Sequence, residues 1–116
     1  MERHLNMASL FYKLKKLFFP SSKEDTFSPT VDLAVDKIML DLSVYDRTKI
    51  ANMNEKRLRL FHESYGIFIR NEFRIWINTP LQKSCCEISG LPKVNPDQAS
   101  YIILKELQKK ISRRMI

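Results

Sequence analysis

The sequence predicts an all-α protein: a compact bundle of about five helices around a long central helix, preceded by a basic amphipathic N-terminal arm. Three observations support this class. Apolar residues recur every three or four positions through most of the chain, which is the period of an amphipathic helix. Only two of the 116 residues are glycine, which leaves little room for hairpin turns. Residue types typical of helix ends flank the periodic segments.

The strongest periodicity predicts a central helix over residues 54–77. Asn54 is a suitable N-cap, and Pro80 should end the helix because the residue before a proline avoids helical dihedrals. Gly66, in the middle, predicts a crossing point at which another backbone approaches closely. The apolar residues that fall on one face of this helix are Leu58, Phe61, Tyr65, Ile69, Phe73 and Trp76.

Four further helices are expected, each with a recognisable end. Thr30 and Ser43 should act as N-caps, and Gly90 should end a helix in the left-handed conformation. Asn95 and Gln98 have the spacing of a capping box, in which each side chain bonds the other residue's backbone N–H. These helices are predicted over residues 31–42, 44–51, 81–89 and 96–112.

The N-terminal part of the chain has a different character. We divide the chain into a basic amphipathic arm (1–19), a Pro- and Ser-containing linker (20–29) and a helical domain (30–116). Lysines interrupt the apolar run that a secretory signal would need, so we expect none. The arm could dock on its own domain or lie on an anionic membrane surface. Its apolar residues are Leu5, Leu10, Phe11, Leu14, Leu17 and Phe18.

The net charge of +7 comes from the two ends of the chain. Residues 1–16 contain four basic side chains and one acidic, residues 105–116 contain five basic and one acidic, and the middle is balanced. This distribution argues against a nucleic-acid groove within the folded core, but it allows the ends to bind a polyanion. The candidate contacts are Lys13, Lys15, Lys16, Lys109, Lys110, Arg113 and Arg114.

The two cysteines, Cys85 and Cys86, are adjacent, and a disulfide between neighbours would be strained. Reduced thiols predict a cytoplasmic protein, apart from a possible peripheral association with membrane through residues 5–18. A zinc site needs spaced cysteines and further ligands, so we expect no metal. We also expect no cofactor, because the chain lacks a phosphate-cradling glycine loop.

Two motifs resemble a family of small bacterial proteins that carry a domain of unknown function. The first is Tyr65-Gly66 followed by Ile69-Arg70-Asn71-Glu72-Phe73 and Trp76, and the second is Asn95-Pro96-Asp97-Gln98-Ala99-Ser100 followed by Ile102-Ile103. Leu81 lies between the two motifs. The likeness covers residues 31–111 and implies a helical fold without implying an activity.

The chain departs from the family pattern at three positions. Ile75, Asn95 and Gln98 stand where the family tends to have Leu, His and Asp. The change at Asn95 removes a histidine, which puts any chemistry that depends on that histidine in doubt for this chain.

Polar residues of the two motifs form the candidate site. One interpretation is structural: Arg70 pairs with Asp97 and holds the central helix to the last one, while Asn71 bonds free backbone groups. The other is a small ligand or partner site. Its candidate residues are His62, Arg70, Asn71, Trp76, Asp97 and Ser100.

The sequence shows no paired catalytic carboxylates, no His-Glu zinc helix and no Ser-His-Asp set, so we expect no enzyme and assign no catalytic residue. Two functions remain. The first is a protein–protein interaction module of the antitoxin, immunity or adaptor type, with an unidentified protein partner. The second is binding of nucleic acid or an anionic membrane surface through the basic ends.

Overall fold

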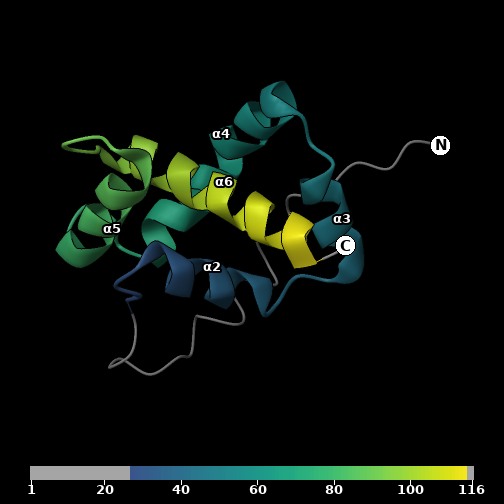
Figure 1. The fold of residues 1–116 in the computed structure, drawn as a ribbon, viewed down its shortest axis with the longest axis horizontal. Coiled ribbons are helices and arrows are strands. Elements are labelled where there is room, and N and C mark those ends of the chain that lie inside the picture. The colour runs from purple at the N-terminus through teal and green to yellow at the C-terminus, as the bar shows by residue number, and fades with distance from the viewer. Residues whose placement is uncertain (1–26, 115–116) are drawn as a thin grey trace.

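The computed structural model describes residues 27–114, which contain five helices and no β-strand (Figure 1). The arm and the first part of the linker, residues 1–26, lie outside the described residues. The all-α prediction is therefore confirmed. No helix within residues 27–114 is long and apolar enough to cross a membrane. The helices are α2 (Val31–Met39), α3 (Val44–Ala51), α4 (Glu55–Glu72), α5 (Thr79–Ser89) and α6 (Pro96–Arg114).

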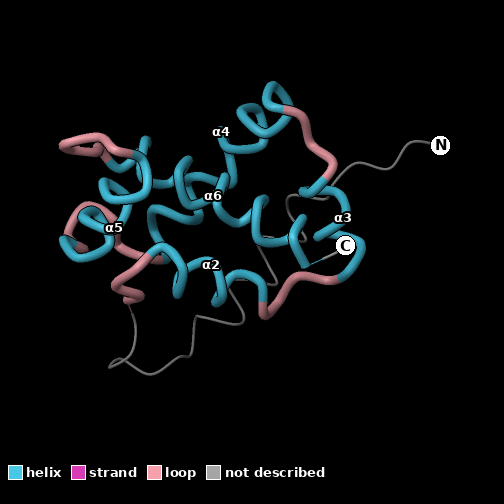
Figure 2. The backbone as a smooth tube through the Cα atoms, viewed as in Figure 1, coloured by secondary structure: helices cyan, strands magenta, loops and turns pink. Residues whose placement is uncertain are grey.

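Helix α6 occupies the centre of the fold. It runs across the middle of Figure 1, with α4 on one side, α2 on the other, and α5 and α3 near its two ends. All four of the other helices pack against α6, and short loops connect them (Figure 2). The central position thus belongs to α6 and not to the predicted helix over residues 54–77. Its buried residues are Ala99, Ser100, Ile103, Leu104, Leu107 and Ile111.

The predicted helix ends are largely confirmed. The side chains of Thr30, Ser43 and Asn54 accept hydrogen bonds from the first turns of α2, α3 and α4. Asn95 and Gln98 form the reciprocal capping box: the Gln98 N–H donates to Asn95 Oδ1 at 2.7 Å, and the Asn95 N–H donates to Gln98 Oε1 at 2.9 Å. Gly90 ends α5 with a left-handed φ of 80°.

The prediction that one helix continues to Ile77 is wrong, because α4 ends at Glu72. Arg74 adopts a positive φ of 50°. Its N–H bonds the Asn71 carbonyl at 3.4 Å, and the Ile75 N–H reaches back to the Arg70 carbonyl at 3.1 Å. These two bonds form a Schellman motif, which usually has glycine where this chain has Arg74.

This early end changes which side chains enter the core. Ile75 is completely buried directly after the turn, whereas Trp76 keeps 49% of its surface exposed. Trp76 was predicted on the buried face of the helix, and that placement is wrong. The rest of the apolar face is confirmed, since these five residues are buried: Leu58, Phe61, Tyr65, Ile69 and Phe73.

Candidate functional site

Four side chains join α4 to α6 in a hydrogen-bonded group that we call the polar cluster: His62, Arg70, Asp97 and Ser100. The Oγ atom of Ser100 lies 2.7 Å from His62 Nε2 and 3.0 Å from Arg70 Nη1. Arg70 Nη1 also donates to Asp97 Oδ1 at 3.2 Å. The predicted pairing of Arg70 with Asp97 is therefore present, and it fastens the end of α4 to the first turn of α6.

Gly66 provides the space that the polar cluster occupies. A Cβ atom at Gly66 would lie 2.6 Å from His62 Nε2 and 2.9 Å from Arg70 Nη1, which is closer than real Cβ contacts. His62, Gly66 and Arg70 are spaced by four residues and lie along one side of α4. The atoms that a Cβ atom there would meet first belong to side chains of the same helix, and the close approach of a neighbouring backbone stays a prediction.

The hydrogen bonds of Ser100 form a complete set. Its hydroxyl donates to the Asp97 carbonyl at 2.9 Å, which leaves two lone pairs to accept from Arg70 Nη1 and from His62 Nε2–H. With the hydroxyl donating to Asp97, the tautomer that completes this set is the one with the His62 proton on Nε2. Ser100 is also fully buried. A nucleophilic serine needs an oxygen that a substrate can reach, and the Ser100 side chain is closed off from solvent.

The environment of His62 favours its neutral form. Burial lowers the pKa of His62 below its ordinary value of 6.5, and the charge of Arg70 acts in the same direction, against the opposing effect of Asp97. The ring also packs edge-on against Tyr101, with centroids 5.2 Å apart. His62, Glu63 and Tyr101 line an open cavity of about 570 Å³ together with Arg59, Asp97 and Gln98.

Asn71 and Trp76 are not part of the polar cluster. The Asn71 carbonyl accepts the Arg74 N–H at the end of α4, and the residue is exposed. Trp76 lies in the turn after α4, half exposed. Of the six candidate residues, the structure brings four together and leaves these two outside.

The basic residues near the C-terminus are partly neutralised by the fold. Lys110 binds Asp32 at 2.8 Å and Asp36 at 2.6 Å, and only 13% of its side chain is exposed. These hydrogen bonds raise the pKa of Lys110 and lower that of Asp32. Lys109 pairs with Glu106 at 3.1 Å.

The other predicted polyanion contacts divide into two groups. Arg113 and Arg114 are exposed in the last turn of α6. Lys13, Lys15 and Lys16 lie outside the described residues.

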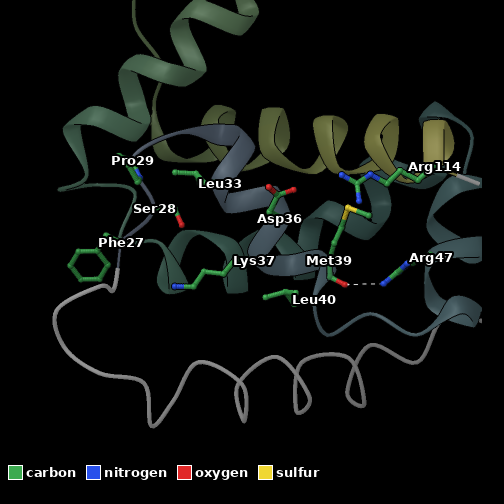
Figure 3. A pocket seen from close by; sticks show the side chains of 10 residues that line it. All are labelled: Phe27, Ser28, Pro29, Leu33, Asp36, Lys37, Met39, Leu40, Arg47 and Arg114. Carbon is green, nitrogen blue, oxygen red and sulfur yellow. Dashed lines mark hydrogen bonds between the residues drawn. The ribbon is translucent and has the colours of Figure 1, made fainter.

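A second candidate site lies along α2 and was not predicted from the sequence. We call it the α2 groove, an open depression of about 810 Å³ (Figure 3). Leu33, Lys37 and Leu40 are spaced like the residues of one helix face, and Leu33 and Leu40 keep 50% and 77% of their surfaces exposed. The groove is lined by Phe27, Ser28, Pro29, Leu33, Asp36, Lys37, Met39, Leu40, Arg47 and Arg114.

The two ends of the α2 groove differ in chemistry. Phe27 and Pro29 lie at one end, and Arg47 and Arg114 lie at the other (Figure 3). Arg47 Nη2 donates to the Met39 carbonyl at 3.2 Å, which holds its guanidinium group beside the C-terminus of α2, where a cation is favoured. The groove therefore changes from apolar to cationic along its length.

The residues that could hold a metal or react as thiols do not form a further site. No three His, Cys, Asp or Glu side chains gather as metal ligands within residues 27–114. Both cysteines are free thiols; Cys85 is buried and Cys86 is partly buried. Burial raises the pKa of Cys85 to about 12, so this thiol stays protonated at neutral pH.

Comparison with known proteins gives one match. The family model described as Domain of unknown function (DUF6794) matches residues 29–111. The chain belongs to this family. The resemblance predicted over residues 31–111 is thereby confirmed. The DUF6794 region contains the whole polar cluster and most of the α2 groove, whereas Phe27, Ser28 and Arg114 lie beyond its limits. No curated protein and no solved structure gives a significant match.

Proposed function

We propose that this DUF6794 protein is a non-catalytic interaction module that binds a protein partner in the α2 groove. The observation that supports the proposal is the pair of exposed leucines, Leu33 and Leu40, beside a groove of about 810 Å³. Leucines that stand exposed two turns apart on one helix face, beside an open depression, form the kind of surface that a partner covers. An antitoxin, an immunity protein or an adaptor would each use such a surface.

The shape of the groove supports a macromolecular partner over a metabolite. Small-molecule sites enclose most of their ligand and direct a few polar groups at it. In the α2 groove the leucines of the wall are mostly open to solvent, with 50% of Leu33 and 77% of Leu40 exposed, and the arginines lie together at one end. A partner that lays a continuous segment along α2 fits this shape better.

The polar cluster, by contrast, supports a structural role. Its hydrogen-bonding groups bond one another between α4 and α6, and we assign it no catalytic step. The free thiols Cys85 and Cys86 are consistent with action in a reducing compartment, as in the cytoplasm.

The test is site-specific photo-crosslinking in cells, followed by calorimetry. A crosslinking amino acid at Lys37, inside the groove, should trap one defined protein, and the same amino acid at the exposed Lys83 on α5 should not. The double substitution Leu33→Asp/Leu40→Asp should then weaken binding of the purified partner by about tenfold or more.

The control pair is Leu60→Asp/Ile67→Asp on α4. These residues have the same spacing, and they are 54% and 50% exposed against 50% and 77% for Leu33 and Leu40, but they lie outside the groove. Equal loss of affinity in both pairs, or equal trapping from positions 37 and 83, would contradict the proposal.

A second candidate function is attachment to a polyanion, which the exposed Arg113 and Arg114 favour. Binding to duplex DNA or to anionic vesicles should then fall steeply with salt. It should also fall in Arg113→Gln/Arg114→Gln. Deleting residues 109–116 is a poorer test, since it also removes Ile111 from the core and Lys110 from its pairs with α2.

A further inference from the structure

We infer that the α2 groove binds an acidic amphipathic helix of a partner protein, with the carboxylates of that helix facing Arg47 and Arg114. This inference rests on the proposed function and specifies the chemistry of the partner. It follows from the spacing of the exposed leucines and from the distribution of charge along the groove.

The spacing of the leucines selects a helix. Leu33 lies in α2, and Leu40, its C-cap residue, keeps helical dihedrals. Seven residues of helix rise about 10 Å, which is two turns. A partner helix packed alongside α2 presents its own apolar residues with the same two-turn repeat, so a short amphipathic helix matches both leucines at once.

The charges select an acidic partner. Two arginines, Arg47 and Arg114, line one end of the groove, and the one acidic side chain among the lining residues, Asp36, shares Lys110 with Asp32, at 2.6 and 2.8 Å. The chain as a whole has a net charge of +7. Complementary potential speeds association with an acidic partner and opposes binding of a basic one.

The position of the arginines sets the direction of the bound helix. Arg47 and Arg114 lie at the end of the groove opposite Phe27 (Figure 3). The C-terminus of a helix carries partial negative charge, which the two arginines would face favourably; carboxylates in that turn weaken a free helix, so they would gain most from pairing with the arginines. The partner helix should therefore place its acidic C-terminal end at Arg47 and Arg114, and its apolar residues over Leu40 and Leu33.

The test uses three fluorescent peptides of the same length, measured by anisotropy with the full-length protein. The first is a designed helix of about 14 residues with leucines at a two-turn repeat and glutamates in its last turn. The second has lysines in place of the glutamates. The third is residues 5–18 of this chain, which are apolar and basic.

The acidic peptide should bind about tenfold or more tightly than the lysine peptide. Arg47→Glu/Arg114→Glu should remove that preference, whereas the matched charge reversal at two exposed lysines elsewhere, Lys83→Glu/Lys93→Glu, should leave it. If Arg47→Glu unfolds the protein, the pair Lys37→Glu/Arg114→Glu tests the same preference and leaves Arg47 unchanged. Leu33→Asp/Leu40→Asp should abolish binding of the acidic peptide.

Stronger binding of the 5–18 peptide would overturn the inference, because the groove would then suit the chain's own arm. Dimerisation that Leu33→Asp/Leu40→Asp abolishes would assign the groove to a second copy and would also overturn it. Failure of all three peptides, together with trapping of a protein from position 37, would reject the acidic helix and leave the proposed function standing. If no peptide binds and no protein is trapped from position 37, both the acidic-helix inference and the proposed function are rejected.

Discussion

The polar cluster and the α2 groove show opposite relations between residue type and role. The cluster contains residue types that often serve in catalysis or ligand binding: a histidine, a serine, an arginine and an aspartate. In this fold these side chains form hydrogen bonds with one another between two helices. The groove is bordered by two leucines that nothing in the sequence distinguishes, and these stay in solvent. The comparison teaches that reactive residue types can serve to hold two helices together, while apolar residue types can be left exposed at the surface that we propose for binding.

The largest effect is expected from Gly66→Ala. Alanine is ordinarily the better helix former by about 1 kcal/mol. Here its Cβ would displace His62 and Arg70 and break buried hydrogen bonds, so we expect a net loss of about 2 kcal/mol. Chemical denaturation measures it. In the His62→Ala background the loss should become smaller, because only the contact with Arg70 Nη1 at 2.9 Å remains, and an unchanged loss there would refute the role of Gly66.

A smaller loss is expected from Ser100→Ala. It removes the acceptor of His62 Nε2 and one acceptor of Arg70, while Arg70 keeps Asp97. Leaving a buried donor unpaired should lower the free energy of unfolding by about 1 to 2 kcal/mol. Thermal and chemical denaturation would both report it. Ser112→Ala, at an exposed position of the same helix, serves as the control and should change little.

Arg74→Gly tests the turn that separates α4 from the core residue Ile75. Glycine adopts the left-handed conformation without strain, so removing the strain should raise the free energy of unfolding by about 1 kcal/mol. The Arg74 guanidinium also lies 5.3 Å from the centre of the Phe27 ring, at the edge of the groove, and that contact would be lost. Arg74→Ala also loses the contact with Phe27, but it keeps the backbone strain of a residue with a side chain at positive φ. The glycine variant should therefore be the more stable of the two in denaturant titrations.

The smallest effect is a pH dependence due to His62. Because its pKa is lowered in the folded protein, the unfolded chain binds more protons between the two pKa values. Stability is then fully present above the ordinary value of 6.5 and decreases as the pH falls through the folded pKa. His62→Gln keeps a donor toward Ser100 but cannot titrate. The difference in unfolding free energy between the two proteins should change with pH in this window; a constant difference would contradict the shift.

The fold could be predicted from the sequence where local chemistry determines structure. The caps at Thr30, Ser43 and Asn54, and the box of Asn95 with Gln98, depend only on neighbouring residues. The end of α4 could not be predicted, since Arg74 adopts the left-handed conformation, for which glycine is the usual residue in a sequence. The central position of α6 could not be predicted either, because periodicity identifies an apolar face but does not show how many helices cover it.

The sites were predictable to different degrees. His62, Gly66 and Arg70 share one side of a helix, and Asp97 and Ser100 begin another, so their meeting could be partly expected. The α2 groove could not be predicted, since the packing of helices distant in sequence decides whether Leu33 and Leu40 are covered. Their spacing of seven residues was the only local signal.

The most direct test of the contrast is the affinity of the acidic helical peptide for two variants, measured by calorimetry at a temperature where both are folded. Ser100→Ala should bind the peptide as the unaltered protein does, despite its lower stability. Leu33→Asp/Leu40→Asp should lose binding while its unfolding free energy stays nearly unchanged. If Ser100→Ala lost the affinity and the leucine pair kept it, the roles assigned to the polar cluster and the α2 groove would be reversed.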